Sequence, residues 1–139
     1  MSGFVVDANV LSEMSRPNPN PSVVSFFNDS PELWLSVIVI HELEFGVQRL
    51  DAGRRRDRYR DNLSAYLARY GNRVLPVGRP EAVFAAGMRA QAARTGRVVH
   101  VADALIAGTA RANDLAVATR NVRDFEGFDV EIVNPWEHV

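Results

Sequence analysis

The stretch Phe4-Val-Val-Asp7-Ala-Asn9-Val10 decides the fold class, because a short apolar run passes directly into residues that begin helices. The uninterrupted apolar run over 4–6 predicts a buried strand. Asp and Asn are favoured at helix N-termini, so a helix is expected to start just after this strand. A buried strand followed at once by a helix is typical of the repeating unit of a parallel sheet.

The rest of the chain continues this alternation. Further strands are predicted over 33–35, 74–77, 115–118 and 130–133. Helices are predicted from Pro21 onward and over 37–50, 54–70, 80–94 and 101–111. The order predicts an α/β fold with three layers, in which a central parallel sheet of four to five strands is flanked by helices. Residues 1–139 are expected to form one domain. Val24, Phe27 and Phe84 are expected to face the core.

The composition narrows the chemistry. All 16 basic residues are Arg, Cys is absent, and the net charge is −1. Without Cys there is no thiol nucleophile, disulfide or Cys-based zinc site, and without Lys there is no P-loop or Schiff-base lysine. Carboxylates, hydroxyls and Arg remain as chemical groups. No leader or membrane span is indicated, so a soluble cytoplasmic protein is expected.

Three carboxylates each have an ordinary structural explanation and a functional one. Asp7 can cap the helix that follows it, and Asp103 can interact with the dipole of its own helix. Glu42 lies in a helix that is apolar almost all round, where it either pairs with an Arg or serves a site. Together they favour the functional reading, because carboxylates that gather without a Lys repel one another unless a cation lies among them.

The polar segment Thr119–Asp124 follows a predicted strand, as Asp7 does. The carboxyl ends of parallel strands meet at one edge of a sheet, so the two regions are expected to lie together. Oxygen ligands of this kind suit Mg²⁺ or Mn²⁺. Acidic sites that hold such ions support the hydrolysis of phosphodiester bonds.

At these residues the chain resembles the PIN-domain ribonucleases, in particular the VapC- and FitB-type toxins of bacterial type II toxin–antitoxin pairs. The resemblance covers nearly the whole chain and is specific because four motifs occur in order. They are Val5-Val-Asp7-Ala-Asn9-Val10, the segment 35–46 around Glu42, Ala102-Asp103-Ala-Leu-Ile-Ala107, and the segment 117–125. The ending Val133-Asn-Pro-Trp136 is also similar to this branch. A PIN-like fold is therefore expected.

The resemblance implies a Mg²⁺- or Mn²⁺-dependent endoribonuclease with Asp7 and Asp103 as metal ligands. Glu42 would bind the ion or orient the attacking water, while Asn9 and Thr119 would support Asp7 through hydrogen bonds. Many members carry a further acid where this chain has Asn121, and Asp124 follows one turn later. Whether Asn121 or Asp124 completes the site is open. The expected catalytic set is Asp7, Glu42, Asp103 and Asp124.

The resemblance also implies a homodimer and a small antitoxin, similar to VapB or FitA, that blocks the site. The basic run over 54–60 is either a solvated helix face or an RNA-binding arm, with Arg55 and Arg58 as the candidate phosphate contacts. Two other functions compete with the ribonuclease. One is a catalytically weak PIN-like binding module, and the other is a Rossmann-like phosphohydrolase, which usually depends on a Lys that this chain lacks.

Overall fold

The computed structural model describes residues 3–30 and 32–139. Residues 1–2 and 31 of the predicted domain therefore lie outside the described residues. Five strands form the sheet: β1 (Gly3–Val6), β2 (Glu32–Ser36), β3 (Val74–Leu75), β4 (Ala116–Ala118) and β5 (Ile132–Val133). Six α-helices accompany them: α1 (Ala8–Met14), α2 (Pro21–Asp29), α3 (Val37–Gln48), α4 (Arg54–Tyr70), α5 (Arg79–Arg94) and α6 (Val101–Ala112). Three short 3₁₀ turns are η1 (Gly71–Arg73), η2 (Val122–Phe125) and η3 (Pro135–Glu137).

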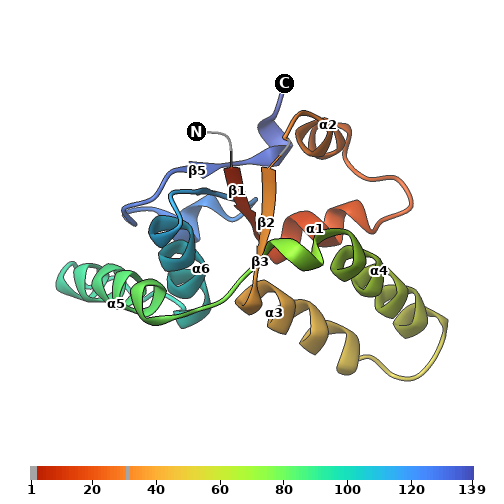
Figure 1. Cartoon of the computed structure of the whole chain (residues 1–139), viewed down its shortest axis with the longest axis horizontal. Helices are drawn as coiled ribbons and strands as arrows, with labels where there is room; N and C mark the ends of the chain where they lie inside the picture. Colours follow the sequence, from red (N-terminus) through yellow and green to blue (C-terminus); the bar gives the residue numbers. More distant parts are fainter. Residues whose placement is uncertain (1–2, 31) are drawn as a thin grey trace.

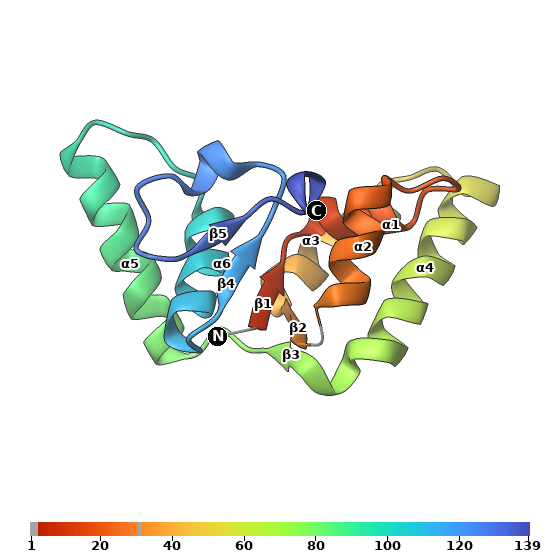
Figure 2. The ribbon, with the colours of Figure 1, turned by 90° about the horizontal axis from the view of Figure 1, so that it is seen from above.

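The strands run in the order β3-β2-β1-β4-β5, and every neighbouring pair is parallel. The predicted parallel α/β sheet is thus confirmed, with five strands. Helices α5 and α6 lie on one side of the sheet, and α1, α2 and α4 lie on the other (Figures 1 and 2). Helix α3 contacts α1, α4 and α6. Within the described residues no helix is long and apolar enough to cross a membrane.

Local sequence explains the beginnings of the helices near the sheet edge. The Asp7 carboxylate accepts a hydrogen bond from the Ala8 N–H at 2.8 Å and so caps α1. The Ser36 hydroxyl oxygen accepts one from the Ile38 N–H at 3.0 Å and caps α3. Asp7 directly follows β1 and Ser36 is the last residue of β2, so each of these strands turns directly into its helix.

Two expectations about the core are wrong. In α2 the fully buried side chains are Val23 and Phe26 rather than Val24, because the Phe26 ring packs edge-on against Phe4 with the ring centroids 5.1 Å apart. Phe27 is half-buried and packs against the core, as expected. Phe84 is 38% exposed on α5 rather than in the core. The Arg111 guanidinium lies over the Phe84 ring, 5.0 Å from the ring centroid. The ring therefore packs against a cation and not against the apolar core.

Candidate active site at the carboxyl edge of the sheet

The two central strands bring Asp7 and Thr119 together. β1 pairs with β4 so that Val6 lies opposite Ala118, and the Asp7 N–H donates to the Ala118 carbonyl oxygen at 2.9 Å. The connections leave β1 toward β2 on one side, whereas β4 lies on the other side of β1. In open α/β sheets, ligands bind outside the carboxyl ends of strands at this kind of switch point.

Asp7 is buried and held by a network of donors. Only 6% of the surface of Asp7 is exposed to solvent. Its Oδ2 accepts from the Thr119 hydroxyl at 2.7 Å and from the Asn9 amide at 3.1 Å. These are the two contacts expected from the sequence. Asn9 also accepts the Arg120 N–H at 3.2 Å, so it links the ends of both strands. Asp7 therefore caps α1 and also presents an oriented carboxylate at the sheet edge.

Glu42 and Asp103 approach Asp7 from two different helices. Burial, together with the charges of Asp7 and Asp103, raises the pKa of Glu42 to about 7. Burial and the charges of Asp7 and Asp124 raise the pKa of Asp103 to about 6, against an opposing effect of His100. Burial is also the main cause that raises the pKa of Asp7. The carboxylates therefore lie within reach of one another's charge.

The two candidates for the fourth position play different structural roles. Asp124 lies in η2, and its charge contributes to the raised pKa of both Asp7 and Asp103. Asn121 is exposed, and the hydrogen bond it supplies comes from its backbone N–H, which donates to the Thr119 hydroxyl oxygen at 3.0 Å. Both residues are exposed, and Asp124 contributes charge near Asp7 and Asp103, whereas Asn121 contributes a backbone hydrogen bond to Thr119.

Arg97 is a residue that sequence reasoning missed. It lies between α5 and α6, and its guanidinium donates to the Arg123 carbonyl oxygen at 2.6 Å within η2. The same guanidinium lies 5.6 Å from the Phe128 ring centroid. It therefore ties η2, which carries Asp124, to the segment that follows it. No local pattern marks this contact, because the two residues are far apart in the chain.

The donor types fit a hard divalent cation. Carboxylate, hydroxyl and amide oxygens are the ligands that Mg²⁺ and Mn²⁺ prefer. Glu42 Oε1 is buried without a hydrogen-bond partner, which is costly unless a cation or water satisfies it. Over residues 3–30 and 32–139, no three His, Asp or Glu side chains are already arranged to hold an ion.

The basic run occupies the first half of α4. The Arg55 and Arg58 guanidinium groups lie 5.7 and 5.8 Å from the Tyr59 ring centroid. Arg60 instead pairs with Glu44 of α3, with 2.7 Å between nitrogen and oxygen, and the Glu44 side chain is half-buried. The arm is therefore partly a structural contact and partly a cationic surface.

The fold and this edge define an α/β protein with an acidic, oxygen-donor site. The family model of the PIN domain matches residues 4–130. The chain is 37% identical to the VapC ribonuclease Y4jK of Sinorhizobium fredii, over 96% of this chain and 98% of that protein. It is 36% identical to the toxin FitB of Neisseria gonorrhoeae, with the same coverage. The chain belongs to the PIN-domain family.

Solved structures agree with the fold. The crystal structure of FitAcB from Neisseria gonorrhoeae superposes with a TM-score of 0.88 and 35% identity, covering 96% of this chain and 99% of that one. DNA-bound VapBC from Salmonella typhimurium gives a TM-score of 0.83 and 27% identity, covering 97% and 99%. The expected PIN-like architecture is confirmed.

Proposed function

We propose that the protein is a metal-dependent endoribonuclease that acts as the toxin of a toxin–antitoxin pair. The observation that carries the proposal is the convergence of Asp7, Glu42, Asp103 and Asp124 at the switch point of a PIN-domain sheet. The names of two similar proteins, a VapC ribonuclease and the FitB toxin, support the same activity and role.

The residues have distinct tasks in this proposal. Asp7 and Asp103 hold Mg²⁺ or Mn²⁺, which supplies charge neutralisation at the phosphate and a more acidic water when it is bound. Thr119 and Asn9 keep the Asp7 carboxylate in one orientation through their hydrogen bonds. Glu42 orients the attacking water, because its carboxylate lies within reach of the charges of Asp7 and Asp103 and its buried Oε1 is left without a hydrogen-bond partner among the described residues. Asp124 completes the negative site.

A cognate antitoxin is the proposed protein partner. Its support is that similar solved structures are FitAB and VapBC complexes, some of them bound to DNA fragments. By covering the acidic edge, such a partner would keep the substrate away from Asp7 and Asp103. The homodimer and the cytoplasmic location remain predictions, and light scattering of the purified chain measures the first of them.

The proposed activity is tested by giving antitoxin-free protein total RNA with Mn²⁺ and sequencing the RNA ends. Internal cuts at recurring sites are the expected result. RNA that is bound but left intact would instead favour the binding module. Release of inorganic phosphate from small phosphate esters without RNA cuts would favour a Rossmann-like phosphohydrolase.

Asp124→Asn is expected to lower the cleavage rate about tenfold or more, whereas Asn121→Ala lowers it only a few-fold. The difference arises because Asp124 contributes charge at Asp7 and Asp103, while the bond from Asn121 to Thr119 uses the backbone, which alanine retains. Single-turnover cleavage of one RNA measures both variants. A fully active Asp124→Asn beside an inactive Asn121→Ala would reverse the assignment.

Arg55→Ala combined with Arg58→Ala is expected to weaken RNA binding and to flatten its dependence on salt. Each lost phosphate contact should reduce the slope of log affinity against log salt by about 0.7 for single-stranded RNA. Titration of a labelled RNA at several salt concentrations measures the slope, with Arg69→Ala, at the far end of α4, as the control. An unchanged slope would show that this face of α4 is only solvated.

A further inference from the structure

A groove of about 300 Å³ lies between α1, α3 and α4 and reaches the acidic edge at one end. Ala8 and Glu42 line that end, next to Asp7, while Arg49 and Arg55 line the groove farther along α3 and α4. Protein pockets that hold small organic ligands have volumes of ~300–1,000 Å³, so the groove can take one small ring system. It connects the proposed catalytic carboxylates to a cationic surface.

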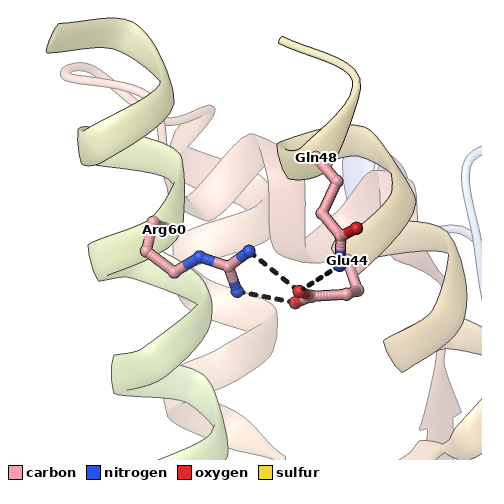
Figure 3. A network of polar contacts seen from close by, with 3 residues as sticks. All are labelled: Glu44, Gln48 and Arg60. Atoms are coloured by element: carbon pink, nitrogen blue, oxygen red, sulfur yellow. Dashed lines mark hydrogen bonds and ion pairs between the residues drawn. The ribbon is translucent and has the colours of Figure 1, made fainter. Parts of the chain in front are cut away.

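The walls of the groove are tied together by polar contacts. The Arg60 guanidinium donates to both carboxylate oxygens of Glu44, at 2.7 and 2.8 Å, and Gln48 donates to the same carboxylate at 2.8 Å (Figure 3). The two bonds from Arg60 join α4 to α3, and the bond from Gln48, within α3, orients the Glu44 carboxylate. The Tyr66 hydroxyl donates to the Leu11 carbonyl oxygen at 2.8 Å and so joins α4 to α1. The groove is therefore a formed feature of the fold and not a gap between loose helices.

Gly46 leaves open space on the α3 wall of this groove. Glycine within a helix is destabilising relative to alanine, so its presence usually has a packing or functional cause. No atom lies within 4 Å of the position that a Cβ at Gly46 would take, so close packing inside the chain does not require the glycine. Because Gly46 lines the groove, a larger side chain at this position would occupy part of it.

The residues that line the groove suit a ligand that combines a flat ring, polar groups on the edge of the ring and an attached anionic group. Leu43 and Val47 supply an apolar surface, and Asn62 supplies an amide that can donate and accept hydrogen bonds. The Tyr59 ring lines the groove, and the Arg55 and Arg58 guanidinium groups lie over it at 5.7 and 5.8 Å from its centroid, so a bound base would share this ring with them. A nucleotide has these properties, since its base stacks on aromatic rings and its phosphates attract Arg.

We propose that this groove binds the RNA base next to the phosphate held at the acidic edge, and so selects the cut site. Tyr59 stacks on the base and Asn62 reads its polar edge, while Arg55 contacts the neighbouring phosphate. The proposal rests on the ribonuclease function proposed above and adds a specificity pocket to it. The two arginines of the lining favour a polyanion over an apolar peptide segment, and a peptide occupant is an outcome of the test.

The test fills the groove without touching the carboxylates. Gly46→Leu extends a side chain into the open space and improves helix propensity, so the fold is retained. Gly87→Leu is the matched control, because Gly87 also lies within a helix, α5, with no atom within 4 Å of its Cβ position, but outside this groove. Tyr59→Leu removes the aromatic face while keeping an apolar side chain.

Binding and cleavage are measured separately on short single-stranded RNAs that differ only in the base beside the cut site. Gly46→Leu and Tyr59→Leu are expected to weaken RNA binding about tenfold or more and to lose the preference among bases, as expected for the loss of one stacked base. Gly87→Leu is expected to match wild type. The metal-induced rise in melting temperature should be unchanged in all three variants, which shows an intact acidic site.

The outcomes separate this proposal from the ribonuclease function. Wild type that cuts RNA, with Gly46→Leu equal to it in affinity and base preference, overturns the pocket and leaves the nuclease. Wild type that binds RNA without cutting, with binding lost in Gly46→Leu, supports the pocket and overturns the nuclease. A Gly46→Leu variant that cuts normally but escapes inhibition by the co-expressed antitoxin assigns the groove to that protein and also overturns the pocket.

Discussion

Excess chelator, or Asp7→Asn, is expected to lower RNA cleavage by at least ~1,000-fold. Positioning and neutralising a phosphate with a divalent cation contributes several kcal/mol to transition-state stabilisation, and each 1.4 kcal/mol corresponds to a factor of ten in rate. In Asp7→Asn, the amide NH₂ group also faces a hydrogen-bond donor whichever way the amide is turned, so it cannot accept the hydrogen bond that a carboxylate oxygen accepts there. Thr119 and Asn9 donate to one oxygen of Asp7, and the Ala8 N–H donates to the other.

The measurement is single-turnover cleavage of a defined RNA with Mn²⁺, with chelator, and with Mn²⁺ restored. Asp114→Asn is the matched control, because Asp114 is exposed, lies just before β4 at the opposite edge of the sheet, and has a positive φ of 57° that Asn also tolerates. The control should cut at the wild-type rate. Cleavage that continues in excess chelator would contradict a metal-dependent mechanism and direct attention to the histidines.

Asp103→Asn is expected to raise the melting temperature of the metal-free protein at pH 7.5 by about 3–8 °C. Burial raises the folded-state pKa of Asp103 to about 6, from its usual value of 3.8, so the native state holds a proton more tightly than the unfolded chain does. Wild-type stability therefore falls as pH rises from about 4 to about 7, and Asn escapes that loss. After discounting for partial exposure to water, we expect a gain of ~1–2 kcal/mol, at about 3–4 °C per kcal/mol.

Differential scanning of both proteins at pH 4.5 and 7.5, with chelator and with Mn²⁺, measures this effect. The difference between the two proteins should be small at pH 4.5, where wild-type Asp103 is largely protonated, and largest at pH 7.5. The variant should also lose most of the stabilisation by Mn²⁺, because only binding to the native state raises the melting temperature. A variant that melts lower at both pH values, with its Mn²⁺ shift intact, would leave Asp103 as a partner of its helix dipole alone.

Patterns of neighbouring residues predicted the elements well. The helix predicted over 54–70 has those bounds, because Gly53 and Gly71 mark its two ends. The predicted parallel sheet was confirmed, and β1 and β2 pass directly into helices that Asp7 and Ser36 cap. That rule also placed Asp7 and Thr119 at one edge before any contact between them was known, because parallel strands end on the same side.

The sequence predicted less well which face of the short helix α2 is buried. In α2 the pairs Val23 and Phe26 or Val24 and Phe27 have the same spacing, so periodicity cannot choose between them. The choice depends on Phe4 of β1 and His138 near the C-terminus, whose rings meet Phe26 at 5.1 and 5.7 Å between centroids. The environment of Phe84 on α5 was also not predictable from neighbouring residues, because the group that packs on its ring is Arg111 of α6.

The sequence by itself determined the α/β class, the order of elements and the carboxylates that follow the strands and begin the helices. These properties depend on burial, caps and periodicity among residues that are close in the chain. Only the tertiary structure decided that Asp124 contributes charge at Asp7, that Arg97 holds η2, and that Glu44 pairs with Arg60 beside a groove. Those contacts join residues on separate elements, and their geometry is set by how the helices pack against the sheet and one another.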